Sequence, residues 1–375
     1  MKALTRLSVA AISAAALLVG VAGTSSALAA GTEHAVFVQS DNLAGNQVVV
    51  YDRGSGGTLT QLGSYSTGGL GGALEGSVVD HLASQGSLTY DRQDGLLYAV
   101  NAGSSTVSVF AVLGEQLALR QVIASGGTFP VSITEHNGVV YVLNADEGGA
   151  LQGFAVSGGR LVQLPGSNRS LGLNPAETPQ FTHTPGQVAF SPDGSQLIVT
   201  TKANGSDIDV FHVGAFGRLA KAPAVNSEPG AVPFAVAFDQ QGDLLVAEAG
   251  TNAVASFELH EDGTLTQLDV VPTGEAATCW IARAGSHFYA SNAGSGTLSA
   301  FRSSAGGQLL TPLGNTPTDG GTVDATVTSS GHFLYVQAGA AGIVDEYAVG
   351  AQGALSEVGS VTVPGAAGGE GIVAG

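Results

Sequence analysis

The chain has 375 residues, a formal net charge of −18, 56 glycines, one cysteine and only 11% charged residues. A surface this acidic repels phosphate backbones, so the composition argues against nucleic-acid binding. The single cysteine, Cys279, excludes an intrachain disulfide and any cysteine-based metal cluster.

Residues 1–30 have the pattern of a secretory signal peptide. Lys2 and Arg6 give a charged start, and residues 7–22 are apolar but too short and too rich in Ala and Ser for a typical membrane span. Ala27-Leu28-Ala29 fits a cleavage site. We expect cleavage near Ala29-Ala30, no membrane anchor, and a secreted, extracellular mature chain.

The stretch 233–268 is the clearest copy of a repeat. Four short apolar runs are separated by turn residues at 240–242, 250–252 and 262–263, a pattern that predicts a four-stranded antiparallel meander. An aromatic residue closes each third strand: Tyr51, Phe110, Phe154, Phe211, Phe257, Phe301 and Tyr347. A leucine opens each fourth strand: Leu59, Leu117, Leu161, Leu219, Leu265, Leu309 and Leu355.

Successive marker leucines lie 44 to 58 residues apart, which is the repeat length of a β-propeller with four strands per blade. The fold class is therefore all-β, and residues 31–375 form one seven-bladed β-propeller. The first unit, at residues 35–38, lacks a preceding strand, whereas residues 371–374 form an extra strand after the seventh unit. We expect this last strand to join blade one and close the ring, which removes the open edges.

Polar residues end the second strands and should surround a central channel: Gln39, Asn101, Asn144, Thr200, Glu248, Asn292 and Gln337. Such asparagines often satisfy the backbone of their own turn, but Asn101, Asn144 and Asn292 are also candidates for ligand binding. Glu248 differs from the other residues of this set because it carries a carboxylate. Before the innermost strands stand Phe234 and Trp280, and the tryptophan could stack on a planar or carbohydrate-like ligand or pack between blades.

Two long insertions, 67–85 and 165–185, are expected on the channel face. Loops of this length either shape a binding site or act as spacers. The first carries Asp80 and His81, and the second carries Arg169 and His183, so each supplies groups suited to acid–base chemistry.

Common chemical motifs are absent from the sequence. It contains no G-x-S-x-G elbow, H-E-x-x-H, P-loop or EF-hand pattern. Carboxylates such as Glu248, Asp324 and Glu370 could provide oxygen ligands for Ca²⁺. Without a motif that fixes their geometry, we predict no metal site and no cofactor.

The repeat resembles the seven-bladed propeller lactonases, which include 6-phosphogluconolactonase and carboxy-cis,cis-muconate cyclase. The resemblance covers the mature chain and rests on Phe190-Ser191-Pro192-Asp193-Gly194, on residues 97–103 and 140–144, and on turns of the 262–265 type. It implies the propeller fold and a lactone-hydrolysing or lactone-forming activity. These motifs belong to the scaffold and are shared with other propellers.

The chain departs from that family at its chemical motifs. The family opens its fourth blade with Pro-His-x-His and its fifth with Gly-Pro-Arg-His. Here Thr184 and Gly186 replace the two histidines, and Phe234 and Ala235 replace the Arg-His pair. Thr201 stands where the family has an aspartate.

Two functions remain open from the sequence. The first is a lactonase-type enzyme for a small lactone without phosphate, in which His183, or His81 with Asp80, activates water. Lys202 or Arg169 would then stabilise the carbonyl oxygen, with Glu248 also in the site. The second is a secreted, non-catalytic binding module on the same scaffold. Either would act as a monomer.

Overall fold

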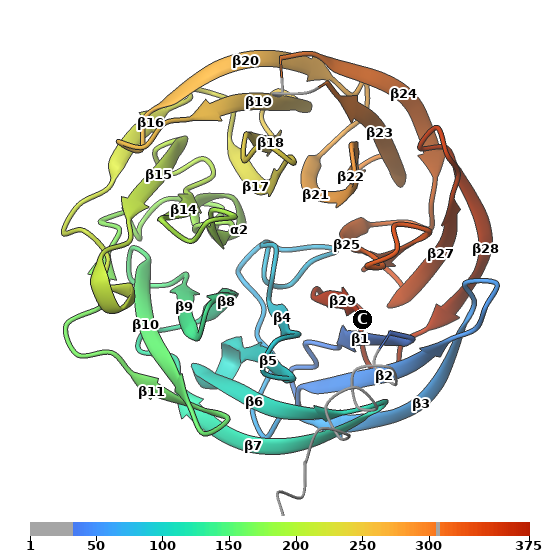
Figure 1. Cartoon of the computed structure of the whole chain (residues 1–375), viewed down its shortest axis with the longest axis horizontal. Helices are drawn as coiled ribbons and strands as arrows, with labels where there is room; N and C mark the ends of the chain where they lie inside the picture. Colours follow the sequence, from blue (N-terminus) through green and yellow to red (C-terminus); the bar gives the residue numbers. More distant parts are fainter. Residues whose placement is uncertain (1–32, 305–307) are drawn as a thin grey trace, which may run out of the picture.

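The computed structural model describes residues 33–304 and 308–375, which form seven blades around a central axis (Figure 1). The expected signal peptide lies outside the described residues. Blade one is β29-β1-β2-β3, blade two β4 to β7, blade three β8 to β11 with β12 paired to β10, and blades four to seven are the successive four-strand sets β13 to β28. The described residues contain no helix long and apolar enough to cross a membrane.

The strands of the first three blades are β1 Ala35–Gln39, β2 Gln47–Arg53, β3 Leu59–Ser66, β4 Leu88–Asp91, β5 Leu96–Asn101, β6 Thr106–Leu113, β7 Gln116–Ala124, β8 Pro130–His136, β9 Val139–Asn144, β10 Ala150–Ser157, β11 Arg160–Gln163 and β12 Arg169–Ser170. Those of blades four and five are β13 Val188–Phe190, β14 Gln196–Thr200, β15 Asp207–His212, β16 Ala224–Ser227, β17 Pro233–Phe238, β18 Leu244–Glu248, β19 Ala253–Leu259 and β20 Leu265–Pro272. Those of blades six and seven, with the closing strand, are β21 Thr278–Ala284, β22 His287–Asn292, β23 Thr297–Ser303, β24 Leu310–Pro317, β25 Thr322–Val327, β26 Phe333–Ala338, β27 Ile343–Val349, β28 Leu355–Thr362 and β29 Ile372–Ala374.

The last strand closes the ring, as the sequence predicts. β29 pairs antiparallel with β1, with Ile372 opposite Val38 and Ala374 opposite Val36. The pairing makes β29 the innermost strand of blade one, so the two ends of the chain share one sheet. With the ring closed, each of the seven blades packs against a neighbouring blade on both of its faces.

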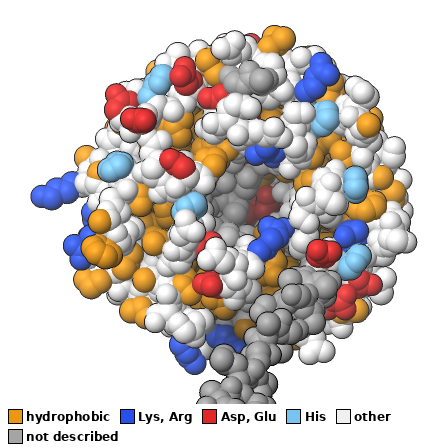
Figure 2. Space-filling view, in the orientation of Figure 1, with side chains coloured by type: hydrophobic (Ala, Val, Ile, Leu, Met, Phe, Trp, Pro, Cys, Tyr) orange, Lys and Arg blue, Asp and Glu red, His pale blue; other side chains and the backbone are white. Residues whose placement is uncertain are grey.

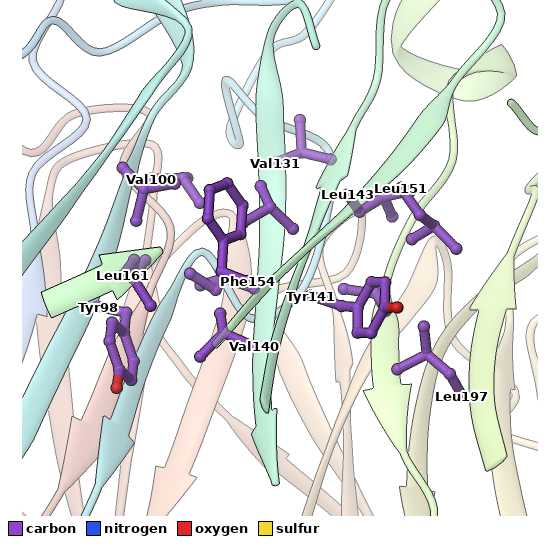
Figure 3. Close-up of a cluster of buried hydrophobic side chains, with 14 of the residues drawn as sticks. Tyr98, Val100, Val131, Val140, Tyr141, Leu143, Leu151, Phe154, Leu161 and Leu197 are labelled. Atoms are coloured by element: carbon purple, nitrogen blue, oxygen red, sulfur yellow. The ribbon is translucent and has the colours of Figure 1, made fainter. Parts of the chain in front are cut away.

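The hydrophobic core consists of clusters between neighbouring blades. One cluster joins blades two, three and four and contains Tyr98, Tyr141, Phe154 and Leu197, all fully or nearly fully buried (Figure 3). Another joins blades seven and one and contains Tyr335 together with Ile372 of the closing strand. The inner strands are continuous apolar runs in the sequence because neighbouring blades cover both faces of each blade.

Buried tyrosine hydroxyls tie successive blades together. The hydroxyl of Tyr141 donates to the carbonyl of Gly217 in the next blade at 2.7 Å. Tyr335 does the same to Gly57 across the closing junction, also at 2.7 Å. Both glycines have a positive φ, a conformation that other residues adopt only with strain. The tyrosine is therefore satisfied without interrupting the apolar contact between blades.

The two faces of the disc differ. The turns between first and second strands lie on one face, called here the hairpin face, and are held by short-range bonds: Oδ1 of Asp239 accepts the N–H groups of Gln241 and Asp243. The turns between second and third strands and the insertions 67–85 and 165–185 lie on the other, called here the insertion face.

The closing strand offers a stability test. Ile372 is 3% exposed, so Ile372→Ala should lower the free energy of unfolding by about 2–5 kcal/mol, measured by urea denaturation. Leu62→Ala on β3 of the same blade is a matched control, because Leu62 is 48% exposed and its loss should cost under about 0.5 kcal/mol. Equal losses in the two variants would contradict a closing role for β29.

Candidate functional site

The insertion 67–85, called here the crossing loop, runs into the centre of the ring (Figure 1). Its Ser84 hydroxyl donates to Val131 in blade three at 2.8 Å, and the side chain of Gln85 forms two hydrogen bonds to the backbone of Ile281 in blade six. The N–H of His81 donates to Gly368, just before the closing strand, at 2.8 Å. A segment bonded to blades on different sides of the ring must cross the channel.

A glycine in blade seven lets the crossing loop approach. A Cβ at Gly339 would collide with the backbone carbonyl of Val79, so only glycine fits between the loop and β26. The loop therefore packs backbone to backbone against this blade.

The second insertion meets the crossing loop above the channel. It ends in a short helix, α2 (Gln180–His183), whose Gln180 side chain accepts from the N–H of Glu75 at 2.8 Å and donates to Asp146 at 2.6 Å. The two insertions therefore form one cover over the insertion face.

Lys202 holds this cover from below. Its ammonium donates to the carbonyl of Ala83 in the crossing loop at 2.7 Å, to the carbonyl of Phe181 in α2 at 2.6 Å, and to the hydroxyl of Thr184 at 3.1 Å. An ammonium has three N–H donors, so all of them are used. Lys202 is 1% exposed, and Lys202 thus joins both insertions to blade four.

The same lysine contacts the positions at which the lactonase-like pattern is lost. Its Nζ lies over the Phe234 ring, 5.2 Å from the centroid, and bonds Thr184. Thr184 and Phe234 are the residues expected to replace a histidine and an arginine. Lys202 therefore places one cation where the sequence suggested that the cations were missing.

Four buried carboxyl groups lie on the other side of the channel: Asp41, Asp80, Asp324 and Glu370. Oε1 of Glu370 accepts the N–H of Ser87 at 3.2 Å, and its own N–H donates to Oδ2 of Asp41 at 2.8 Å. Asp80 is on the crossing loop, where its two oxygens accept the N–H groups of Leu82 and Ser84 at 2.8 and 3.0 Å. The insertion face therefore encloses a cluster of acids.

Burial changes the protonation of these groups. Loss of hydration raises the pKa of Asp41 and of Asp324 to about 7, and that of Asp80 to about 6. The pKa of Glu370 is raised well above its usual value by burial and by its acidic neighbours. Burial lowers the pKa of Lys202 to about 7, opposed by the charge of Asp80. Proton exchange is therefore possible near neutral pH.

The aromatic candidates are structural members of this cluster. Trp280 is buried against Phe234, with ring centroids 4.9 Å apart, and its indole N–H donates to the carbonyl of Ser84 at 2.5 Å. Phe234 and Trp280 therefore pack together, and Trp280 anchors the crossing loop to blade six. Cys279 is buried beside them, and burial raises the pKa of its thiol to about 12, which makes it unreactive at neutral pH.

The two histidines are not paired with an acid. Asp80 bonds the backbone of its own loop rather than His81, whose Nδ1 is buried without a partner in the described structure. Burial lowers the pKa of His81. Nδ1 of His183 lies 3.0 Å from the carbonyl of Pro179 and 2.9 Å from the hydroxyl of Thr182, inside its own helix.

Glu248 and the asparagines are bonded to protein groups near the ends of their strands. Glu248 accepts from the hydroxyl of Thr251 at 2.7 Å, and burial raises its pKa. Asn101 and Asn292 donate to serine and threonine hydroxyls of the following strand, and Asn144 to the carbonyls of Ser125 and Ala150. These side chains hold the ends of the second and third strands together.

Arg169 is also bound to the scaffold. Its guanidinium donates to the carbonyls of Ala220, Leu219, Gly166 and Asn168 at 2.6–3.0 Å, which joins β12 to blade four. The structure therefore brings Lys202, Asp80, Trp280 and Phe234 together. The hydrogen bonds of Arg169 involve none of these four residues.

Asp41 and Gln180 are the site residues that the sequence reading did not single out. Asp41 follows β1 and has a positive φ of 49°, which is unusual for a non-glycine residue, and no sequence motif marks this position. In the described ranges, no group of three or more His, Cys, Asp or Glu side chains has the arrangement of a metal site.

Comparison with known proteins identifies the family. A family model described as "Lactonase, 7-bladed beta-propeller" matches residues 50–368. The chain belongs to this lactonase family. No curated protein sequence matches it.

Solved structures share the fold of this lactonase-family chain at low sequence identity. A candidate 6-phosphogluconolactonase from Bacteroides fragilis is 17% identical with a TM-score of 0.70, covering 91% of this chain and 98% of the other. The periplasmic gluconolactonase PpgL of Pseudomonas aeruginosa is 17% identical with a TM-score of 0.72, covering 90% and 98%. A protein from Lactobacillus plantarum is 20% identical with a TM-score of 0.72 over the same shares.

The buried acids predict a pH-dependent stability. A carboxyl whose pKa is raised on folding stabilises the fold below its unfolded pKa, and that stabilisation is lost as pH rises through the folded value. With Asp324 near 7 when folded against an ordinary 3.8, Tm should fall between pH 4.5 and 7.5. In Asp324→Asn this fall should be smaller by about 2–4 °C.

Glu261→Gln, at an exposed turn of blade five, is the control for that experiment and should leave the pH profile unchanged. An Asp324→Asn profile that is parallel to the wild type would mean that Asp324 is not the group that titrates.

Lys202 gives a second prediction. Lys202→Met removes three hydrogen bonds to the cover, so thermolysin should cleave within 67–85 and 165–185 about tenfold faster or more. Lys221→Met, which removes an exposed lysine, should be cleaved at the wild-type rate. Equal cleavage of both variants would show that the lysine does not hold the insertions.

Proposed function

We propose that the protein is an exported enzyme that hydrolyses a small, uncharged lactone beneath the crossing loop, in the region of Asp80, Lys202 and Phe234 that is called here the chamber. The observation that carries the proposal is the meeting of Asp80, on the crossing loop, with Lys202, on blade four. Each shifts the pKa of the other, although no ion pair shorter than 4 Å joins them in the described residues. A base and a cation from separate elements are thus both buried beneath the crossing loop.

The chemistry follows from these groups. The Asp80 carboxylate takes a proton from water while the water oxygen attacks the lactone carbonyl carbon. The Lys202 ammonium stabilises the negative charge on the carbonyl oxygen. When the ring C–O bond breaks, the leaving oxygen takes a proton from a carboxylic acid of the cluster, and the product is a hydroxy acid.

Closure of the crossing loop would assemble the site. Asp80 and Ala83 are both on the loop, so opening it frees one Lys202 N–H from Ala83 and admits substrate. Closing it returns Asp80 to the chamber and excludes water. The substrate carbonyl oxygen would keep the Nζ donor that Ala83 released, so with substrate bound the loop closes without restoring the Ala83 bond.

The charge of the chamber supports an uncharged substrate. Asp80 and the overall charge of −18 oppose a further negative group beside Lys202, so a phosphate or carboxylate on the substrate would be repelled. One structural neighbour is named a gluconolactonase, and gluconolactone carries no charge. Residues 1–30 support export by their signal-peptide pattern.

A pH-stat assay of lactone opening tests the proposal. Uncharged lactones should be opened at least tenfold faster than a phosphorylated one. The rate kcat/KM should rise through a pKa of about 6 and fall above about 7, since Asp80 must be ionised and Lys202 protonated. Asp80→Asn and Lys202→Met should each lower kcat/KM about 10²-fold or more.

His183→Gln is the control, because His183 bonds within α2, and it should change kcat/KM by less than about threefold. Full activity in a folded Asp80→Asn variant would overturn the assignment of the base. Loss of activity in His183→Gln and in His81→Ala would favour histidine chemistry instead.

The closed chamber favours a second candidate function, a non-catalytic binding module. All three N–H donors of Lys202 are satisfied by protein oxygens. Absence of turnover across neutral and acidic lactones, with the protein folded by circular dichroism, would select this function.

A further inference from the structure

A cavity of about 370 Å³ opens on the hairpin face. Its lining includes Arg92 from the β4–β5 turn of blade two, Arg283 and Gly285 from blade six, and Thr328 and Ser329 from blade seven. Blades two, six and seven can border one cavity only near the axis of the ring. Figure 2 shows a hollow at the centre of the disc with blue Lys or Arg side chains at its rim.

Both arginines of this cavity are held by neutral groups. Arg92 donates through Nη2 to the carbonyl of Ala374 and lies over the Tyr90 ring at 5.5 Å. Arg283 donates through Nε to Gly285 at 2.7 Å, and through Nη1 to the carbonyls of Phe238 and Asp239. These bonds fix the two guanidinium planes without compensating their charge.

No carboxylate neutralises either arginine. Across residues 33–304 and 308–375, neither guanidinium lies within 4 Å of a carboxylate oxygen. Asp91, next to Arg92, and Asp239, whose carbonyl accepts from Arg283, each use Oδ1 to accept two N–H groups of their own turn. Two uncompensated cations at one cavity are unusual in a chain with a net charge of −18.

Donors remain available for a ligand. Nε and Nη1 of Arg92 and Nη2 of Arg283 have no hydrogen-bond partner in the described part of the chain. A guanidinium offers parallel N–H donors that match the oxygens of a carboxylate or phosphate. The hydroxyls of Thr328 and Ser329 on the same wall donate to the carbonyls of Phe333 and Gly375, so the donors open to a ligand are those of the arginines.

We propose that this axial cavity of the hairpin face is a binding site for a small anion carrying a carboxylate or phosphate group. The anion would lie between Arg92 and Arg283. The site is separate from the chamber of the crossing loop and does not depend on lactone hydrolysis.

Isothermal titration of the purified protein at low ionic strength, with inorganic phosphate and with gluconate as separate probes, tests the site. At least one probe should bind, and Arg283→Gln should weaken it at least tenfold. Binding of phosphate alone would assign the site to phosphorylated ligands, and binding of gluconate alone would assign it to carboxylates.

Two controls separate this site from other causes. Arg302→Gln removes an exposed arginine of blade six and should bind as the wild type does, which excludes a general charge effect. Lys202→Met should also bind normally, which excludes the chamber of the crossing loop.

If Arg283→Gln does not fold, Ser329→Phe fills the cavity while both arginines stay, and it should abolish binding. The proposal is overturned if neither probe binds the wild type, or if folded Arg283→Gln or Ser329→Phe binds as tightly as the wild type.

Discussion

Closure of the ring is the constraint on which the whole structure depends. Each blade covers its faces only with its neighbours, so an open ring would leave two apolar faces in water. Three residues of β29 pair with β1 and prevent this. The tyrosine hydroxyls that reach glycine carbonyls in the next blade add a polar bond to each apolar junction where they occur, including the junction between blades seven and one.

A closed ring of blades leaves a central channel, and this chain fills it on one face with charged groups and a loop. Burial of four carboxyls and a lysine is costly, and the cost is reduced when acids take up protons and the lysine gives one up. The pKa values near 6 to 7 for Asp80, Asp324 and Lys202 reflect this balance. At the opposite mouth, Arg92 and Arg283 line a cavity.

The fold could be predicted from sequence because its signal is repeated. The marker residues recur once in each unit, and the missing first strand of blade one was visible as an unmatched strand at the end of the chain. The site was only partly predictable. Lys202, Asp80, Trp280 and Phe234 could be named, because the insertions and strand ends are recognisable, but their partners could not.

The reason is that the partners of these residues depend on the path of the crossing loop. Nothing in residues 67–85 shows that Ala83 meets Lys202, or that Asp80 caps its own backbone instead of contacting His81. The partners of the asparagines, in contrast, could be predicted. A short amide side chain tends to bond nearby backbone and hydroxyl groups, and Asn101 and Asn144 do so.

Gly339 has a consequence for how such a chamber can vary among propellers. The depth to which the crossing loop descends is set by the backbone contact between Val79 and residue 339, where any side chain would push the loop outward. Gly339, the residue that follows β26, thus limits how closely the crossing loop can approach blade seven. A substitution at position 339 can therefore change the volume of the chamber, and the size of molecule that it admits, without changing Asp80 or Lys202.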